Sequence, residues 1–544
     1  MSRLTGGEAI VKSLLMQGVN TIFGLPGVQN DFFYNALFDE QENIRVIHTR
    51  HEEGAAYMAL GYALSSDKAG VYNVVPGPGL LNTTAALATA YACNAKVLCL
   101  TGQIESPFIG RQIGLLHEIP DQLGLIRSLT KWAMRISSPV QAPGLVAEAF
   151  RQMRSGRPRP VGLECAMDVL ASRAEVDLTP ITPEVYPPPV DMDSVGAAAR
   201  LLGKAKFPMI FVGGGAMDAG EEVRQIAEAL QAPVISSVNG RGILSSRHYL
   251  SHTLPGGYHL WDKVDVALAV GTHLQFPQML WGVDDQLEII KIDIDPEEHG
   301  RISQPAVKMV ARSQDALKAL LPELEKYNMV RPSRKVEMEA LKDEIDRQLS
   351  SLEPQMSFIR AIREELPEDG FFVDEMTQVG YVSGMAMPVY QPGTYLYPGY
   401  QGTLGWGFPS ALGVKVANPD RPVLSIAGDG GFMFSVQELA TAVKHRIATV
   451  TVIFNNNAYG NVKLLQKTRY DNRVIASDLH NPDFVKLAEA FGVEGIRAQT
   501  PDELREALQK GFDSNNPTII EVPMGEMPSP WPIFRPPQKR PARK

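Results

Sequence analysis

The chain has 544 residues, 44% of them apolar and 21% charged, which is the size and composition of a globular protein with about three or four domains. Its net charge of −9 and isoelectric point near 5.7 argue against nucleic acid or an anionic membrane as the main partner. No run approaches the roughly 18 apolar residues of a membrane span, and the N-terminus lacks the apolar core of a signal peptide.

Two changes in composition divide the chain. Residues 171–192 are rich in proline and indicate a stiff connector. Residues 327–356 are rich in charge and predict a polar helix between Pro332 and Pro354. The last stretch, 528–544, is proline-rich with a basic end, and we expect a surface tail or a lid over a site.

Three blocks remain, and strand and helix signals alternate in each of them. Such alternation predicts an α/β protein whose doubly wound, Rossmann-like domains have parallel sheets with helices on both faces. The predicted domains are residues 1–172, 190–328 and 355–527, followed by the tail 528–544.

In the first block, three loops follow predicted strands. Strands 21–23, 44–48 and 71–75 lead into loops that end at Gly27, Gly54 and Gly79, and the predicted helices cover 8–16, 55–64 and 82–91. Because doubly wound folds bind ligands at the carboxyl ends of their strands, we expect these loops to line a site.

The middle block carries Gly213-Gly214-Gly215 after a strand. The full spacing of a dinucleotide motif with its ribose-binding acid is missing, which favours a tight turn, and nucleotide or flavin binding stays open as the alternative.

The third block holds the most informative pattern. A buried strand, 423–427, ends at Gly428-Asp429-Gly430-Gly431, and the next strand, 448–454, ends at Asn455-Asn456-Asn457. Glycines let backbone N–H groups approach an anion, while Asp429, Asn456 and the carbonyl of Ala458 offer the oxygen ligands that Mg²⁺ prefers. The helix between these strands is expected to begin near Ser435, with Glu438 completing a capping box.

With these motifs, nearly the whole chain resembles the thiamine diphosphate-dependent family of acetolactate synthase, pyruvate oxidase and benzoylformate decarboxylase. The resemblance implies a pyrimidine-binding domain, a central domain and a diphosphate-binding domain, in that order. It implies thiamine diphosphate and Mg²⁺ as cofactors, with Asp429, Asn456 and Ala458 as the metal ligands.

A second family hallmark, Arg-His-Glu after a strand of the first domain, matches Arg50-His51-Glu52. The resemblance makes Glu52 the carboxyl group that shares a proton with N1′ of the aminopyrimidine and so activates the thiazolium. It makes Leu404 the apolar wedge between the two rings. The cofactor-binding residues it implies are Pro26, Pro78, Asn82, Glu375, Met376, Thr377, Gln378, Gly402, Leu404, Gly428, Asp429, Gly430, Gly431, Asn456, Ala458, Tyr459 and Gly460.

The substrate is less determined. Leu116-His117-Glu118 stands where acetolactate synthases have Phe-Gln-Glu, and Leu465 stands where they have a tryptophan that selects the acceptor. His117 is a candidate proton donor, with a surface or structural histidine as the alternative. The residues expected to face the substrate are Val28, Gln29, Asn30, Val462 and Leu465.

The predicted function is therefore a thiamine diphosphate- and Mg²⁺-dependent 2-oxo acid decarboxylase or carboligase, similar to acetolactate synthase. Its enamine intermediate would pass to a proton or to a second carbonyl. The alternatives are an oxalyl-CoA decarboxylase-like or 2-hydroxyacyl-CoA lyase-like enzyme, a benzoylformate decarboxylase-like enzyme, a flavin-dependent oxidase, and an inactive cofactor-binding scaffold subunit.

The resemblance also implies a homodimer or homotetramer in which Glu52 and Asp429 of one chain serve different sites. The three cysteines, Cys93, Cys99 and Cys165, lie in apolar stretches without metal-ligand spacing, which is typical of reduced core residues. We expect a cytoplasmic protein that binds neither nucleic acid nor membrane.

Overall fold

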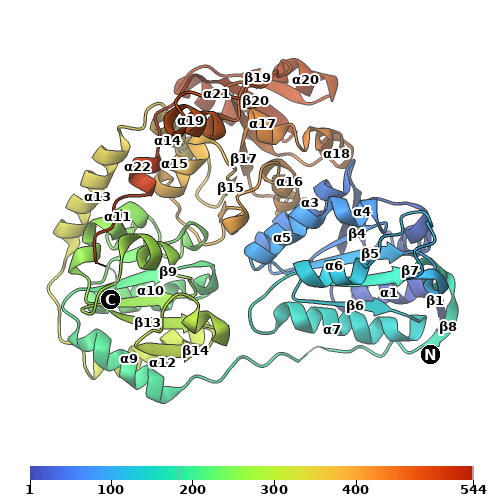
Figure 1. Cartoon of the computed structure of the whole chain (residues 1–544), viewed down its shortest axis with the longest axis horizontal. Helices are drawn as coiled ribbons and strands as arrows, with labels where there is room; N and C mark the ends of the chain where they lie inside the picture. The colour runs from blue at the N-terminus through green and yellow to red at the C-terminus, as the bar shows by residue number, and fades with distance from the viewer. Residues whose placement is uncertain (183, 542–544) are drawn as a thin grey trace.

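The computed structural model describes residues 1–182 and 184–541, so part of the predicted tail, 542–544, lies outside the described residues. Three six-stranded sheets with parallel pairing each form the centre of one domain (Figure 1). The predicted α/β class with three parallel, doubly wound domains is confirmed. No helix in the described ranges is long and apolar enough to cross a membrane.

The first domain has the strand order β3-β2-β4-β5-β7-β6. Its strands are β2 (Thr21–Gly24), β3 (Arg45–His48), β4 (Gly70–Val74), β5 (Val97–Gln103), β6 (Trp132–Ile136) and β7 (Val161–Ala166). Its helices are α1 (Gly6–Met16), α2 (Asp31–Asp39), α3 (Glu52–Leu64), α4 (Pro78–Asn82), α5 (Thr84–Ala92), α6 (Gln122–Leu129), α7 (Ala142–Arg154) and α8 (Met167–Ala171). A short antiparallel pair, β1 (Ser2–Thr5) with β8 (Arg173–Val176), joins the ends of the domain and was not predicted.

Alternation along the strands explains why helices cover both faces of this sheet. Leu98 packs into one apolar cluster, and the next residue, Cys99, packs into another on the opposite face. Both residues are fully buried, as expected for a parallel strand between two helical layers.

The central domain has the order β11-β10-β9-β12-β13-β14. Its strands are β9 (Pro208–Val212), β10 (Val234–Ser236), β11 (Ser251–His252), β12 (Val266–Val270), β13 (Glu288–Asp293) and β14 (Val307–Val310). Its helices are α9 (Met192–Lys204), α10 (Gly220–Leu230), α11 (Leu254–Leu260) and α12 (Ser313–Glu325), and the polar α13 (Lys335–Leu349) leads to the third domain.

The glycine run of the central domain is explained by packing. A Cβ on Gly215 would lie 2.8 Å from the Cα of Gly271, so the loops after β9 and β12 touch backbone to backbone. The acid that ends β13, Asp293, accepts a hydrogen bond from Arg157 of the first domain at 3.0 Å. The contact of Gly215 with Gly271 fits the tight turn that the sequence favoured.

The third domain has the order β16-β15-β17-β18-β20-β19. Its strands are β15 (Phe371–Val373), β16 (Tyr395–Leu396), β17 (Val423–Gly428), β18 (Val450–Asn455), β19 (Glu494–Arg497) and β20 (Thr518–Pro523). Its helices are α14 (Gln355–Glu365), α15 (Gln378–Ala386), α16 (Gly407–Ala417), α17 (Asp429–Phe432), α18 (Leu439–His445), α19 (Gly460–Arg469), α20 (Phe484–Ala490) and α21 (Pro501–Ser514).

The tail crosses from the third domain to the central domain. Its short helix α22 (Trp531–Phe534) places the Trp531 indole N–H 2.8 Å from the side-chain oxygen of Asn461. Farther on, the buried guanidinium of Arg540 donates to the carbonyl of Trp261 and to the carboxylate of Asp284. The described part of the tail is therefore anchored at both ends.

The first and third domains meet where α3 packs on α16, as Figure 1 shows. Two glycines permit the contact. A Cβ on Gly61 would overlap the backbone carbonyl of Ser410, and one on Gly413 would overlap that of Met58. The two helices therefore touch backbone to backbone, and no larger residue fits at either position.

This contact makes a paired prediction. Gly413→Ala should destabilise the folded chain by about 3 kcal/mol or more, because backbone atoms must move to admit the methyl group. Gly144 lies in α7 with open space around it, so Gly144→Ala should stabilise the chain by about 0.5–1 kcal/mol. Urea unfolding of both variants measures the difference, and equal effects would contradict the packing argument.

Candidate active site

Glu52 is the first residue of α3, at the carboxyl edge of the first sheet. His51 caps the helix, because its Nδ1 accepts the backbone N–H of Glu53 at 3.2 Å. This cap starts the helix three residues before the predicted Ala55. The side-chain amide of Asn82 donates to the Glu52 carboxylate at 2.9 Å, and a Cβ on Gly79 would lie 3.6 Å from that carboxylate. The structure thus brings Glu52 together with α4, whose first and last residues are Pro78 and Asn82.

His117 lies next to the start of α4. Its backbone packs under Gly77, and its Nδ1 lies 3.0 Å from the side-chain oxygen of Gln29. The amide of Gln29 also donates to the carbonyl of Leu116 at 3.1 Å. Gln29 and His117, predicted from separate stretches of sequence, therefore contact each other next to Gly77, the residue before α4.

The loop after β2 contains both exposed and buried residues, although all of those predicted to contact a ligand were expected to be accessible. Val28 is 59% exposed and Pro26 is exposed, so both can face a ligand. Asn30 cannot, because it is fully buried and its side chain contacts the backbone of Gly27 and the amide of Asn73. Asn30 holds the loop in shape, which corrects the expectation that it faces the substrate.

In the third domain, strand register brings the two predicted metal-binding loops together. Gly428 at the end of β17 pairs with Phe454 of β18, so Asp429 and Asn456 emerge at the same edge of the sheet. Asp429 is 2% exposed, and burial raises the pKa of its carboxyl group even though Asn481 and backbone N–H groups donate to it. Buried charges in proteins are usually paired with an opposite charge or coordinate a metal ion.

The donor set fits Mg²⁺. Within the described part of the chain, the Asp429 carboxylate is held by the Asn481 amide at 2.6 Å and by backbone N–H groups, without a Lys or Arg partner. The side-chain oxygen of Asn456 accepts the backbone N–H of Ala458 at 3.2 Å, so these two predicted ligands belong to one turn, and the backbone N–H of Asn456 donates to the Asp429 carboxylate. Oxygen donors of this kind are those that Mg²⁺ shares with a diphosphate.

The loops around this turn are closely fitted. A Cβ on Gly430 would lie 2.6 Å from the ring of Tyr459, and one on Gly460 would lie 2.6 Å from the Asn456 amide. Gly431 contacts the Glu375 carboxylate. These contacts favour glycine at all three positions. The approach of backbone N–H groups to an anion stays a prediction.

Glu375 has a different position from the one its motif suggested. Its two carboxylate oxygens accept the backbone N–H groups of Gly405 and Gly407 at 2.9 and 3.0 Å. It is 1% exposed, and burial raises its pKa to about 7. Glu375 therefore supports the loop that carries Leu404, which is half-buried.

The neighbours of Glu375 occupy the start of α15. Thr377 caps this helix by accepting the N–H of Gly380 at 2.7 Å, and Gln378 is its first residue. Met376 faces Gly402, whose Cβ would lie 3.7 Å from the Met376 sulfur, and Gly402 adopts a φ of 54° that favours glycine.

The predicted substrate residues of the third domain lie on α19. Val462 is 50% exposed and Leu465 is half-buried, and no residue of this helix is fully buried in the described chain. An open helix with apolar side chains is suited to contact a ligand or a second subunit.

Two functional candidates were missed or misread in the sequence. Asn481 bridges Asp429, Asn455 and Asn457 through its amide, and a single asparagine in a loop gives no sequence signal. The predicted capping box of Ser435 and Glu438 does not form, because the Ser435 side chain makes no cap and Glu438 points to the first domain. The predicted helix instead begins as a short 3-10 turn, Val436–Glu438, and continues as α18.

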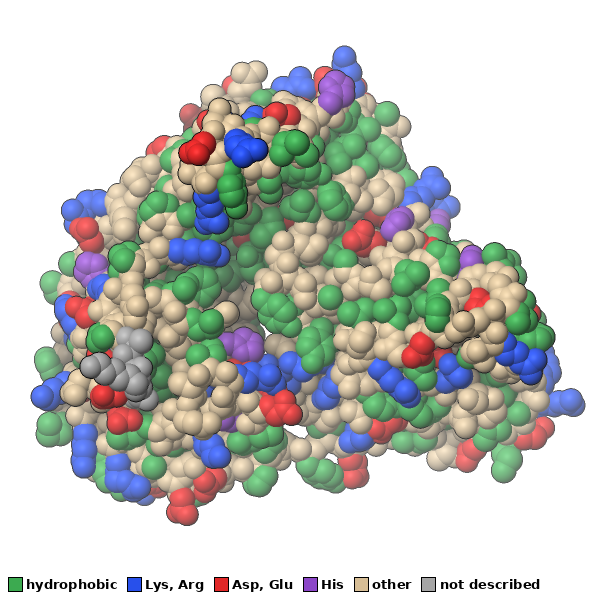
Figure 2. Space-filling view, viewed as in Figure 1, with side chains coloured by type: hydrophobic (Ala, Val, Ile, Leu, Met, Phe, Trp, Pro, Cys, Tyr) green, Lys and Arg blue, Asp and Glu red, His purple; other side chains and the backbone are tan. Residues whose placement is uncertain are grey.

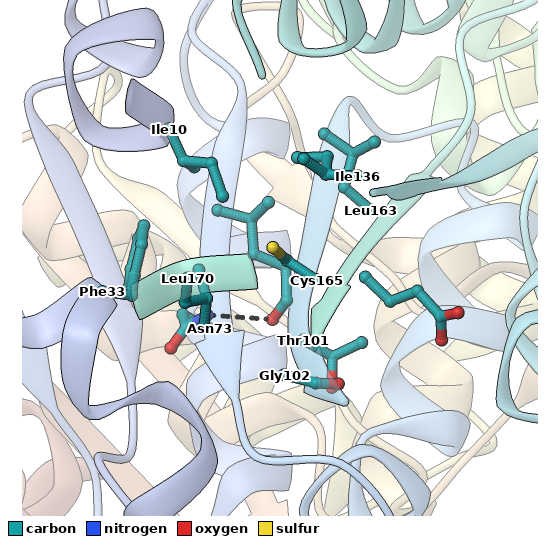
Figure 3. A pocket seen from close by; sticks show the side chains of 11 residues that line it. Ile10, Phe33, Asn73, Thr101, Gly102, Ile136, Leu163, Cys165 and Leu170 are labelled. Carbon is teal, nitrogen blue, oxygen red and sulfur yellow. Dashed lines mark hydrogen bonds between the residues drawn. The ribbon is translucent and has the colours of Figure 1, made fainter. Parts of the chain in front are cut away.

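The cavity in Figure 3 is not this site. It lies inside the first domain between Ile10, Phe33, Leu163 and Cys165, and its volume of about 10 Å³ admits at most one water. The hydrogen bonds of Glu52 and His117 lie in the first domain, whereas those of Asp429 and Asn456 lie in the third. One chain thus carries these two groups in different domains, and we call each group a half-site.

Apolar side chains are exposed around both half-sites. Figure 2 shows apolar surface over the first and third domains. The exposed apolar residues near the two groups of loops are Val28, Leu81, Ile113, Leu116, Met433, Phe434 and Val462.

Comparison with known proteins gives consistent matches along the chain. Three thiamine pyrophosphate enzyme models match: the N-terminal TPP binding domain at residues 4–125, the central domain at 195–320 and the C-terminal TPP binding domain at 376–522. A probable 2-ketoarginine decarboxylase of Pseudomonas aeruginosa is 34% identical, with 95% of this chain and 94% of the relative covered.

Two further relatives are acetolactate synthase large subunits. The probable large subunit of Methanocaldococcus jannaschii is 33% identical over 95% of this chain and 92% of its own length. The isozyme 1 large subunit of Escherichia coli is 29% identical over 98% of this chain and 96% of its own length.

The raised pKa of Glu375 predicts a pH-dependent stability. Because its folded pKa of about 7 exceeds the ordinary value of 4.5, the folded state binds more protons between these values, and stability falls as the pH rises through this window. Glu375→Gln should remove about 2 to 3 kcal/mol of that fall between pH 4.5 and 7.5. Urea unfolding across the window measures it, with the exposed Glu339→Gln as a control whose slope matches wild type.

Proposed function

The chain belongs to the thiamine pyrophosphate enzymes, and on this premise we propose that it decarboxylates a 2-oxo acid and releases the corresponding aldehyde. Enzymes of this kind are decarboxylases and carboligases, and the relatives carry both kinds of name. The proposal concerns the outcome of the reaction, the substrate class and the residues that act.

The observation that carries the proposal is the contact of His117 with Gln29. It lies next to Gly77, at the start of the segment whose Asn82 donates to Glu52. A histidine side chain can act as a general acid, so His117 can give a proton to a reaction product at this position. Release of an aldehyde requires such a proton, whereas addition to a second carbonyl requires a carbon acceptor. A proton donor at this place favours the aldehyde.

The cofactor would be held by the two half-sites. Thiamine diphosphate, when bound, supplies a carbon nucleophile and an acceptor for the electrons released with CO₂. Asp429, Asn456 and the carbonyl of Ala458 would hold Mg²⁺ and through it the diphosphate. Glu52 would share a proton with N1′ of the aminopyrimidine, while the Asn82 amide fixes the direction of its carboxylate.

Val462 and Leu465 support a substrate with a side chain larger than that of pyruvate. Both are aliphatic and incompletely buried on α19. Leu465 stands where the resembled synthases have a larger tryptophan, which leaves space for the substrate. Acetolactate synthase-type transfer to a second 2-oxo acid is the second candidate, and the names of two relatives favour it.

A homodimer or larger homo-oligomer would complete the site. The half-sites of one chain lie in different domains, and exposed apolar residues such as Leu116 and Phe434 lie near them in the chain. In the proposed assembly, Glu52 of one subunit acts on the cofactor held by Asp429 of the next. The contact between the subunits would bury those apolar side chains.

A panel of 2-oxo acids tests the proposed reaction. Pyruvate, 2-oxobutyrate, benzoylformate and 2-oxo-5-guanidinopentanoate are supplied with thiamine diphosphate and Mg²⁺, and CO₂, aldehyde and 2-hydroxy-2-alkyl-3-oxo acid products are measured. We expect one equivalent of aldehyde per CO₂ and at least a 100-fold loss in Glu52→Gln.

His117→Gln should lower aldehyde release about tenfold or more, whereas His259→Gln, which changes an exposed histidine of α11, should not. A condensed 2-hydroxy-3-oxo acid as main product would replace this proposal with the synthase reaction. No CO₂ from any acid, oxalyl-CoA included, would favour the scaffold alternative, and a yellow protein would favour the oxidase.

Asn481 gives a separate test of the metal half-site. Asn481→Ala leaves the Asp429 carboxylate without its amide donor, so the Kd for Mg²⁺ in the presence of thiamine diphosphate should rise about 10- to 100-fold. Calorimetric titration measures the change. The exposed Asn43→Ala serves as the control, and equal affinities for both variants would remove Asn481 from the site.

A further inference from the structure

Glu438 connects the third domain to the loop before Glu52. Its carboxylate accepts the backbone N–H of Arg50 at 3.1 Å and that of His51 at 3.0 Å. It is fully buried, and Thr441 donates a side-chain hydrogen bond to it at 2.5 Å. A glutamate of one domain thus fixes two consecutive amides of another.

The surroundings of Glu438 are shaped for this contact. A Cβ on Gly54 would lie 2.6 Å from its carboxylate, so the first turn of α3 approaches it closely only because residue 54 is glycine. The carboxylate also faces the positive, N-terminal end of a 13-residue helix. Glu438 therefore sets both the path of the loop and the start of the helix that carries Glu52.

We propose that Glu438 is a positioning residue for the reaction: it holds the Arg50–His51 backbone so that the Glu52 carboxyl group meets the cofactor at N1′. The inference rests on the proposed role of Glu52 and adds to it a residue from the other domain. The contact lies within one chain, on the stretch 429–438 that begins at the metal-binding turn.

The reason for a carboxylate at this place is geometric. Two adjacent N–H groups donate to the Glu438 carboxylate, whose two oxygens both accept. A glutamine side chain has only one accepting oxygen, and its –NH₂ group repels an N–H donor. Small displacements of a catalytic group are costly, since a shift of about 1 Å can lower a rate about 100-fold. Glu438→Gln should therefore reduce kcat while the distant cofactor-binding turn stays intact.

Glu375 provides a matched comparison. It is also a buried glutamate of the third domain that accepts two backbone N–H groups, but it supports the loop of Leu404 before α16. Any general loss caused by removing a buried carboxylate should occur in Glu375→Gln as well. Only Glu438 should act through Glu52.

A double-mutant cycle on the full-length enzyme with thiamine diphosphate and Mg²⁺ tests the inference. We expect Glu438→Gln to lower kcat about 100-fold with the Kd of the cofactor within about twofold of wild type. In a Glu52→Gln background, Glu438→Gln should cost no further activity, whereas Glu375→Gln should still cost as much as it does alone.

Hydrogen–deuterium exchange supplies a readout that is independent of turnover. In Glu438→Gln, exchange should accelerate in peptides that contain residues 50–53 and stay unchanged in peptides that contain residues 429–431. Thr441→Val removes a donor to Glu438 with little change in shape, and should lower kcat about three- to tenfold. If Glu438→Gln folds poorly, the same measurements of kcat and exchange are made on Thr441→Val.

The outcomes separate the two proposals. If Glu52→Gln lowers turnover at least 100-fold and Glu438→Gln lowers the residual turnover further in that background, Glu438 is not a positioning residue and the proposed function stands. The same conclusion follows if Glu438→Gln leaves exchange at residues 50–53 unchanged. If Glu52→Gln is fully active, the proposed role of Glu52 fails and the inference fails with it.

Discussion

The backbone contact between α3 and α16 is the constraint on which the rest of this chain depends. Gly61 and Gly413 let the helices approach until carbonyl groups fill the space where side chains would stand. Because each helix begins at one of the functional loops, their packing fixes those loops relative to each other. Glu52 opens α3, and Leu404 precedes α16 by a few residues.

Two buried carboxylates complete this constraint. Glu438 accepts the amides of the two residues before α3, and Glu375 accepts those of Gly405, before α16, and Gly407, its first residue. Burial of both acids costs free energy, as their raised pKa values indicate. A cost of this kind is tolerated where the hydrogen bonds specify a conformation that apolar packing alone would leave loose.

The sequence predicted the layout well because each local signal agreed with the fold. Buried β-branched runs followed by glycine loops identified the strands, and parallel pairing then placed Asp429 beside Asn456. The contact between Gln29 and His117 depends on a loop conformation that spacing does not encode. Asn30 was expected to face the substrate because of its neighbours in the chain, but the turn points its amide inward.

The prediction for Glu438 went wrong for a related reason. Ser435 and Glu438 have the spacing of a capping box, and local rules assign such a glutamate to its own helix. In the fold, the acid finds two unpaired amides on another domain, and these outweigh the one local amide that a cap would satisfy. The strongest partner of a buried charge is set by tertiary structure. Local sequence patterns therefore do not reveal the role of a residue such as Glu438, whose partners lie in another domain.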